Sequence, residues 1–237
     1  MIIGAESSLR KPPKIGDQKQ VRFIDAIRLT AEGVDIAYER LVDELSNFEN
    51  ECERRDYKVA SLVLDAWSVI DSVHRLRGLV DNMPRYKGRA PSKQIFLRAT
   101  KDVVDLRNSV QHLGTDIDSL AESELPVLGA LTWIRPINEA SGEMSVESLI
   151  PGQFYFVQPE SHVQVPDTVP DRLNHIKLWA SGGSADISAL VVAVDRLCQS
   201  LEASLTKHMD QLPDQSRADS DIHAVIEVKL VPAEDKA

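Results

Sequence analysis

The stretch DYKVASLVLDAWSVIDSVHRLRGLVDN, residues 56–82, decides the fold class of this chain. Its apolar residues recur at every third or fourth position, which is the period of a helix that buries one face. Those residues are Leu62, Ala66, Val69, Ile70, Val73, Leu76 and Val80. The segment that follows, MPRYKGRAPS, contains prolines and a glycine that end such a helix. The stretch therefore predicts one long amphipathic helix.

Two further helical patterns lie on either side of this stretch. Residues 21–54 have apolar residues at the same spacing and predict one long helix, although Gly33 weakens it locally. Residues 92–113 predict a third helix, with Ser92 as its cap and Gly114 at its end. The second and third helices are expected to be antiparallel neighbours, so the first half of the chain would form a helical bundle.

After Pro126 the pattern changes from helix to strand. Short runs rich in β-branched and aromatic residues, separated by turn residues, predict an antiparallel sheet. The runs are VLGALTWIRP, QFYFVQP, SHVQVP and NHIKLWA. Residues 181–186, SGGSAD, then predict a loop and a cap for a fourth helix from Ile187 to about Met209. A last strand is expected over residues 222–231.

These patterns predict an α+β fold: a mainly helical up-down bundle of about four long helices, with an antiparallel strand-rich segment inserted before the fourth helix. The helical part would comprise residues 21–122 and 184–211, and the strand-rich part residues 126–180 and 221–232. Both would belong to a single domain over residues 21–237. Residues 1–20 are expected to form a flexible N-terminal segment.

The composition is that of an ordinary globular protein, with 43% hydrophobic and 27% charged residues. No run of about 18 apolar residues occurs, and the N-terminus does not resemble a signal peptide, so we expect no membrane span and a cytoplasmic location. Cys52 and Cys198 are expected to be reduced, buried thiols. Neither they nor His162, His175 and His223 have metal-ligand spacing, so we expect no metal and no cofactor.

The fingerprints of common nucleotide-binding and hydrolase families are missing from the sequence. There is no G-x-x-x-x-G-K-[ST] loop, no G-x-G-x-x-G after a strand, no H-E-x-x-H and no G-x-S-x-G. The segment SGGSAD could offer backbone amides to an anion at the start of the fourth helix. Because such amides are present at every helix start, a linker and cap is the favoured interpretation.

The net charge of −10 argues against a nucleic-acid surface, because phosphate binding depends on Lys and Arg. The charge is uneven, however. From Arg75 to Arg107 there are nine basic and three acidic residues, a local balance of +6 that leaves −16 for the remainder. This asymmetry permits a basic face on an acidic protein. Solvated helix surfaces and a polar loop explain the same charges equally well.

The stretch DLRNSVQHLG, residues 105–114, places three chemically useful side chains at the end of the third predicted helix. At about 100° per residue, Asn108 and His112 lie within about 140° of Arg107, so the three share one side of the helix. A histidine can move a proton, and an arginine can neutralise charge that develops on a phosphoryl group. The carbonyl end of the helix favours a charged imidazole. A metal-independent ribonuclease needs these groups.

This motif, placed in a helical bundle, resembles the HEPN superfamily (higher eukaryote and prokaryote nucleotide-binding domains). Catalytic members of that family carry R-x4-6-H, often with Asn directly after the Arg. The resemblance covers the four predicted helices, with DAWSVIDSVHRLRGLV in the second, and does not account for the strand-rich segment. A bare R-x-x-x-x-H arises readily by chance, so the placement on a helix carries the resemblance.

The resemblance implies a homodimer in which two motifs face each other across a cleft and cleave single-stranded RNA without a metal. Arg107 would bind phosphate, His112 would act as acid and base, and Asn108 would give polar support. Such an enzyme could be a toxin or defence effector held by an inhibitory protein partner. The basic residues expected to guide RNA are Arg85, Lys87, Arg89, Lys93, Arg98 and Lys101.

Three polar residues of the second helix, Asp71, His74 and Arg75, share one side of it at i, i+3 and i+4. If the second and third helices pack antiparallel, this side would lie beside the motif and orient it. The alternative is a surface ion pair that contributes little.

A non-catalytic interpretation of the motif stays open. Arg107 could pair with Asp105 or with an acidic residue of the first helix, and His112 could serve the helix end. The chain would then be a helical interaction module that dimerises and binds a protein or a nucleotide ligand. The acidic pI of about 5.1 favours this alternative. It predicts that Arg107 and His112 are held in intramolecular hydrogen bonds.

Overall fold

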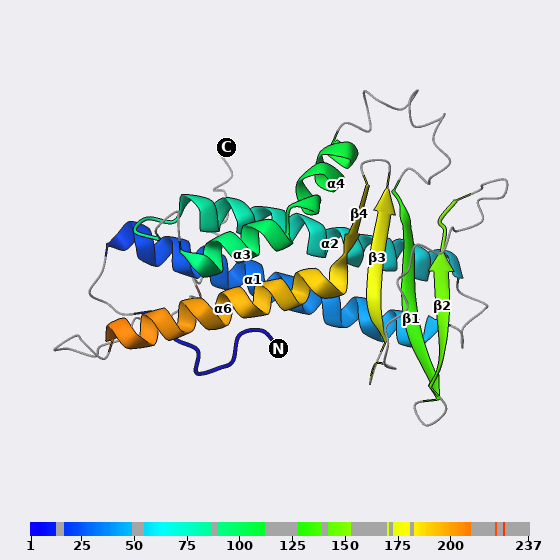
Figure 1. The fold of residues 1–237 in the computed structure, drawn as a ribbon, viewed down its shortest axis with the longest axis horizontal. Coiled ribbons are helices and arrows are strands. Elements are labelled where there is room, and N and C mark those ends of the chain that lie inside the picture. The colour runs from blue at the N-terminus through cyan, green and yellow to red at the C-terminus, as the bar shows by residue number, and fades with distance from the viewer. Residues whose placement is uncertain are drawn as a thin grey trace, which may run out of the picture.

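The computed structural model describes residues 1–12, 17–48, 55–86, 90–111, 128–138, 142–152, 170, 173–180, 183–209, 221 and 225. Helices and a four-stranded antiparallel sheet make up this part of the chain, and helix predominates. Most of the helices run along the long axis of the molecule, one short helix stands away from them, and the sheet stands across one end (Figure 1). The predicted combination of a mainly helical chain with an antiparallel sheet is confirmed.

The helices are α1 (Gln18–Ser46), α2 (Arg55–Asn82), α3 (Pro91–Ala99), α4 (Asp102–Gln111) and α6 (Ile187–Met209). α1 and α2 pack along their length, while α6 contacts both of them and also α3 (Figure 1). Apolar positions that the helical spacing identified, such as Leu62, Val69 and Leu76, are fully buried. α3 begins at Pro91 without a side-chain cap, so the predicted cap at Ser92 is wrong.

The sheet has the strand order β2-β1-β3-β4, and all neighbours are antiparallel. Its strands are β1 (Ala130–Asn138), β2 (Glu143–Leu149), β3 (Asn174–Ala180) and β4 (Gly183–Asp186). β1 and β3 arise from predicted runs, whereas β2 and β4 were not expected because EMSVESL has few apolar residues and GSAD begins with glycine. QFYFVQP, SHVQVP and most of residues 222–231 lie outside the described residues.

The segment SGGSAD was predicted to be a loop and a cap, and its last four residues instead form β4. The capping part of the prediction is confirmed, because the Oδ1 atom of Asp186 accepts a hydrogen bond from the Ala189 amide at 2.9 Å. α6 follows directly, from Ile187 to Met209, as the sequence predicts. The strand therefore leads into the helix without a connecting loop.

Arg135 of β1 joins the sheet to the end of α1, which stops at Ser46 instead of near residue 54. Its guanidinium donates to the carbonyl oxygens of Leu45 at 2.8 Å and Ser46 at 2.9 Å, and it also pairs with Glu147 of β2. Burial is the largest single effect on Glu147 and raises its pKa, but the hydrogen bonds from Arg135 and Ser145 together with the charge of Arg135 hold the pKa of that carboxyl below its ordinary value. One arginine thus satisfies a helix end and links two strands.

The N-terminal segment was expected to be flexible, and over residues 1–12 it packs against the helices. Ile3 and Leu9 are each only 1% exposed and belong to the main hydrophobic core. Ser7 donates a hydrogen bond to the Glu202 carboxylate of α6. Burial of these apolar side chains offsets the entropy lost by ordering the segment, which the short Ile2-Ile3 run did not reveal.

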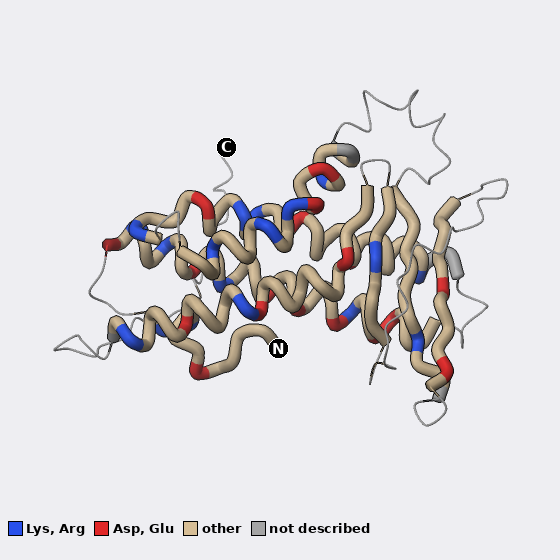
Figure 2. The backbone as a smooth tube through the Cα atoms, viewed as in Figure 1, with Lys and Arg blue, Asp and Glu red and all other residues tan. Residues whose placement is uncertain are grey.

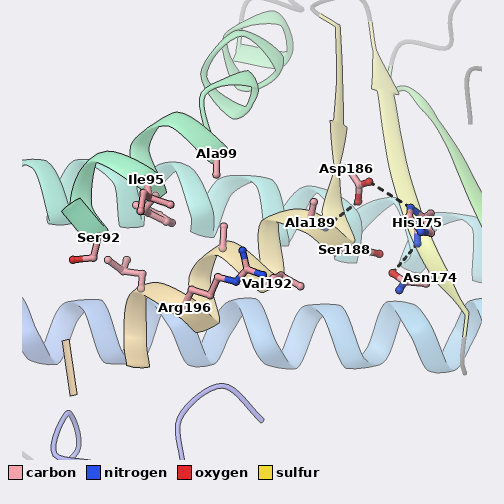
Figure 3. A pocket seen from close by; sticks show the side chains of 13 residues that line it. Ser92, Ile95, Ala99, Asn174, His175, Asp186, Ser188, Ala189, Val192 and Arg196 are labelled. Atoms are coloured by element: carbon pink, nitrogen blue, oxygen red, sulfur yellow. Dashed lines mark hydrogen bonds and ion pairs between the residues drawn. The ribbon is translucent and has the colours of Figure 1, made fainter. Parts of the chain in front are cut away.

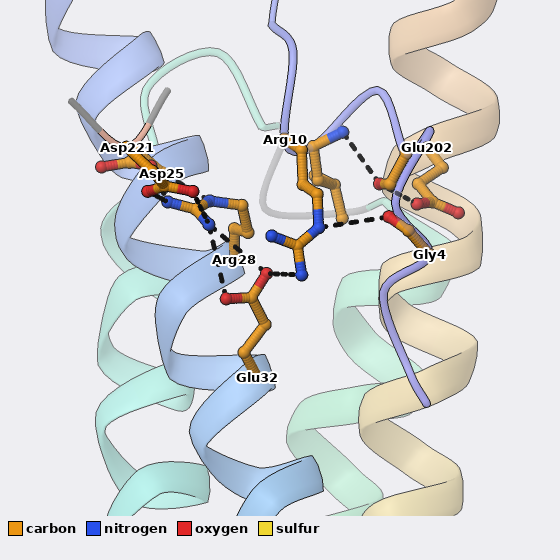
Figure 4. A network of polar contacts seen from close by, with 9 residues as sticks. Gly4, Arg10, Asp25, Arg28, Glu32, Glu202 and Asp221 are labelled. Carbon is orange, nitrogen blue, oxygen red and sulfur yellow. Dashed lines mark hydrogen bonds and ion pairs between the residues drawn. The ribbon is translucent and has the colours of Figure 1, made fainter. Parts of the chain in front are cut away.

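A buried arginine organises an ion cluster on α1 (Figure 4). Arg28 has a side chain that is 2% exposed, and its guanidinium pairs with Asp25 at 2.9 Å, Glu32 at 3.4 Å and Asp221 at 2.7 Å. Glu32 in turn pairs with Arg10 of the N-terminal segment at 2.7 Å. Three separate parts of the chain therefore meet at one buried cation, which the carboxylates compensate.

A single helix over residues 92–113 is wrong, because residues 91–111 form two helices, α3 and α4, separated by Thr100 and Lys101 (Figure 1). Thr100 is fully buried, and its hydroxyl donates to the Phe96 carbonyl at 2.8 Å and accepts from Arg77 of α2 at 2.6 Å. Arg77 also donates to the Leu97 carbonyl. These bonds satisfy carbonyl groups at the end of α3, so the helix can stop although the apolar spacing continues into α4.

Candidate active site

Arg107 projects from α4 towards α2 and forms an ion pair there. Its Nε atom donates to the Oδ1 atom of Asp71 at 3.0 Å, and the two side chains are 24% and 46% exposed. The contact uses one donor of the guanidinium, and the two terminal nitrogens have no partner among the described residues. Asp71 therefore orients Arg107 through Nε, and no described residue occupies its terminal donors.

The observed partner of Arg107 differs from the expected one. The non-catalytic interpretation named Asp105 or an acidic residue of the first helix as the partner of Arg107, and the observed partner is Asp71 of the second helix. That side of the second helix contacts Arg107 through Asp71, and its role in orienting the whole motif stays a prediction. α2 and α4 pack together, which brings the two residues close although they are 36 positions apart.

His74 lies about one turn along α2 from Asp71, and its pKa depends on burial and on the charges near Arg107. Burial lowers the pKa of His74 below its ordinary value, and the positive charges of Arg107 and Arg77 lower it further, against a smaller opposing effect of Asp71. The imidazole is therefore neutral at pH 7 and able to accept a proton. The sequence did not single out Arg77, although its position three residues after His74 placed it on the same side of the helix.

We expect the His74→Gln protein to lose less stability in acid than the wild type. Because the pKa of His74 in the folded protein is below the unfolded value of about 6.5, the unfolded chain binds the proton more readily. The free energy of unfolding contributed by His74 is thus complete above about pH 6.5 and decreases as the pH falls below it. Urea unfolding at pH 7.5 and pH 5.5 measures this, with His208→Gln on α6 as control. An equal acid loss in wild type and His74→Gln would contradict the expectation.

The other residues of the predicted site are only partly placed. Asn108 is exposed beside Arg107 on α4. Arg75 is exposed on α2 and forms no ion pair among the described residues, so its orienting role has no structural support. His112 lies outside the described residues, one position after α4. The alignment of Arg107, Asn108 and His112 therefore stays a prediction.

The six basic residues expected to guide RNA differ in their surroundings. Lys93 is buried, and its Nζ atom donates to the Asp81 carbonyl at 2.8 Å and pairs with the Asp81 carboxylate at 3.0 Å. Its predicted role is wrong, because Lys93 joins α3 to the end of α2 and does not face solvent. Arg85, Arg98 and Lys101 are exposed.

The remaining two basic residues, Lys87 and Arg89, lie outside the described residues. In Figure 2, basic segments gather where α3 meets α4, with acidic segments beside them. Arg98 and Lys101 occupy this junction, and Asp102 follows directly. The described surface here is of mixed charge, so its attraction for RNA would depend on ionic strength.

The described residues offer no group of three or more His, Cys, Asp and Glu side chains that could hold a metal ion. The prediction for Cys198 is confirmed: the thiol is buried and free. Burial raises the pKa of Cys198 to about 12, and the nearby charges of Glu202 and Asp195 add to the effect. Cys52 lies outside the described residues. A thiol with so high a pKa is a poor nucleophile at neutral pH.

Comparison with protein-family models, curated proteins and solved structures found no match. Within the described residues, no helix is both long and apolar enough to cross a membrane. The resemblance to the HEPN superfamily therefore rests on the motif and its helical setting, and it stays a prediction.

Proposed function

We propose that this protein is a HEPN-like, metal-independent endoribonuclease that acts on single-stranded RNA. The side of the molecule formed by α2 and α4 would be its active site. Arg107 would bind the scissile phosphate, His112 would be the acid and base, and Asn108 would support them. A role as a toxin or defence effector, restrained by an inhibitory protein, would suit such an activity.

One observation carries the proposal: the Asp71 carboxylate holds Arg107 through Nε at 3.0 Å and leaves its terminal nitrogens without partners among the described residues. A guanidinium positioned this way can bind two oxygens of one phosphate. Positioning by a neighbouring side chain also reduces the entropy lost when the phosphate binds. Arg107 therefore meets a requirement of catalysis that exposed lysines and arginines on long mobile side chains do not.

The reaction would proceed by attack of the ribose 2′-hydroxyl on the adjacent phosphorus. A base removes the proton from the 2′-oxygen, the P–O bond to the 5′-oxygen breaks, and an acid returns a proton to that leaving oxygen. Arg107 would stabilise the negative charge on the non-bridging oxygens. The products would be a 2′,3′-cyclic phosphate and a free 5′-hydroxyl, and no metal or oxidant takes part.

The direct test incubates the purified wild-type protein with labelled single-stranded and hairpin RNAs in EDTA. We expect cleavage within the single-stranded parts and a 2′,3′-cyclic phosphate on the upstream product. Cleavage that appears only when a divalent cation is added, or intact RNA in every reaction, would contradict the proposal.

We also predict that the active protein is a homodimer. Each chain carries one copy of the motif, whereas cleavage requires both an acid and a base, and a two-fold axis supplies a second copy of each. Light scattering at micromolar concentration should give about twice the chain mass of 26.3 kDa. A monomer under the conditions in which RNA is cleaved would exclude the composite site.

The second candidate is a non-catalytic helical module that dimerises and binds a protein or nucleotide ligand. The Arg107–Asp71 pair favours it as well, because this candidate predicts that the arginine is held by intramolecular bonds. The two candidates differ in what the pair does. In a module the pair would only stabilise the contact between α2 and α4, so its removal would change stability and leave ligand binding unchanged.

A further inference from the structure

A pocket of about 610 Å³ lies between α3, α6 and the adjoining ends of β3 and β4 (Figure 3). Its walls are mainly apolar. α3 contributes Ile95, Phe96 and Ala99, and α6 contributes Val192, Ala193 and Leu197. Ile95 and Val192 are 62% and 48% exposed, so the apolar wall extends to the mouth of the pocket. The volume lies in the range of pockets that hold small organic molecules, and apolar walls of this kind bury the body of such a ligand.

Polar side chains close the pocket at the sheet end (Figure 3). His175 adopts a left-handed backbone conformation with φ of 53°, which is strained for a residue with a side chain. Its amide donates to the Asn174 side-chain oxygen at 2.8 Å, and its Nδ1 atom lies 4.0 Å from the Asp186 carboxylate. Strain that persists at a cavity wall is typical of binding sites, because the surrounding structure must maintain it.

One carboxylate and one guanidinium line the pocket, and they differ in their partners. The carboxylate of Asp186 is matched within the protein, since it caps α6 through the Ala189 amide at 2.9 Å and faces His175. Arg196 also lines the pocket and is exposed, and it forms no ion pair with any described residue. Among the described residues, Arg196 is therefore the charged group of the pocket that lacks a partner, and it lies beside the apolar wall of α6.

We propose that this pocket binds a small monoanionic molecule with an apolar body, such as an aryl or alkyl carboxylate. The body would lie between α3 and α6, against Ile95 and Val192, and the acidic group would pair with Arg196. Burial of the body provides the hydrophobic part of the affinity, and the charged hydrogen bonds of Arg196 select the anion. This site shares no residue with the Arg107 site, so the inference does not depend on the proposed nuclease activity.

Calorimetry and saturation-transfer NMR with 4-phenylbutyrate would test the proposal on the full chain, with 4-phenylbutanamide as the neutral probe of the same shape. We expect saturable binding of about one 4-phenylbutyrate per chain. Arg196→Gln should weaken its binding about tenfold or more and leave the amide unaffected, because only the anion uses the arginine. Lys207→Gln, which removes an exposed cation elsewhere on α6, should leave both affinities unchanged.

A second pair of variants tests the apolar wall. Ala99→Trp places a large side chain at an exposed position on the wall and should abolish binding of both probes, whereas Ala203→Trp, at an exposed position of α6 outside the pocket, should not. Circular dichroism would show whether both variants are folded. If Ala99→Trp does not fold, Ala189→Trp on the opposite wall of the pocket replaces it in the test. Equal binding of acid and amide, or unchanged binding in the folded wall variants, would overturn the proposal.

Discussion

The His112→Ala protein is expected to cleave single-stranded RNA about 100-fold to 10,000-fold more slowly than the wild type in EDTA, with an unchanged urea midpoint. A positioned acid or base accelerates such reactions by a factor of this size, and the variant loses that acceleration. His208→Ala, an exposed histidine at the end of α6, is the matched control and should cleave at the wild-type rate. The rates are measured in single-turnover assays, so that product release does not mask the chemical step.

Variants of Arg107 and Asp71 test the role of the arginine and of its ion-pair partner separately. Arg107→Gln should lower the cleavage rate about 100-fold or more, because the charge on the phosphoryl oxygens loses its partner. Asp71→Asn should have a smaller effect, since an amide oxygen can still accept the Nε hydrogen bond at 3.0 Å and only the charge is lost. Asp105→Asn, an exposed acid on α4, is the control for the change in charge.

Two outcomes would exclude the active site proposed for α2 and α4. Cleavage that persists in purified His112→Ala protein at the wild-type rate would show that the histidine is not the acid or base, or that a contaminant cleaves the RNA. A large loss in Asp105→Asn, equal to that in Asp71→Asn, would show that the rate follows net charge instead of the orientation of Arg107.

Arg28→Met is expected to lower the free energy of unfolding by about 3 kcal/mol. Arg28 is fully buried, and its removal leaves Asp25 and Glu32 of α1 and Asp221 without their common partner. The loss should fall at the lower end of the range for buried pairs, because Asp25 and Asp221 are 47% and 57% exposed and water can solvate them. Urea unfolding, analysed as a two-state transition, measures the change.

Arg22→Met on the exposed side of α1 is the matched control for Arg28→Met, and its effect should stay within about 0.5 kcal/mol. A loss below about 1 kcal/mol in Arg28→Met would mean that the cluster contributes no more than a surface ion pair. A double-mutant cycle with Asp221→Asn then separates the contact to Asp221 from the two contacts within α1.

Much of the fold could be predicted from the sequence because it depends on local periodicity. The apolar spacing of residues 56–82 predicts α2 almost to the residue, and Asp186 with the following apolar pattern predicts the start of α6. β1 and β3 follow from β-branched and aromatic runs. β2 could not be predicted in this way, because its pairing with β1 depends on the hydrogen bonds of the neighbouring strand and not on its own side chains.

The candidate site could be predicted only in part. Spacing on one helix places Arg107 and Asn108 on the same side of it. Spacing on the second helix indicates which side of it, the one with Asp71, would lie near them. The burial of Lys93 could not be predicted from the sequence. A lysine near a polar loop has the same sequence context whether it faces solvent or pairs with Asp81. The pocket beside His175 had no sequence signal, because its lining comes from three separate parts of the chain.

The sequence by itself determined α1, α2, α6, β1 and β3, because apolar residues that repeat every 3.6 or every 2 positions show which face of a helix or strand is buried. The tertiary structure alone decided where the third predicted helix ends. The apolar spacing runs on through Thr100 to Val103 and Leu106, all fully buried, so nothing local signals a break. The break requires Arg77 of α2, whose donors satisfy the carbonyl of Leu97 and the hydroxyl of Thr100, and a hydrogen bond from another helix exists only once the helices have packed.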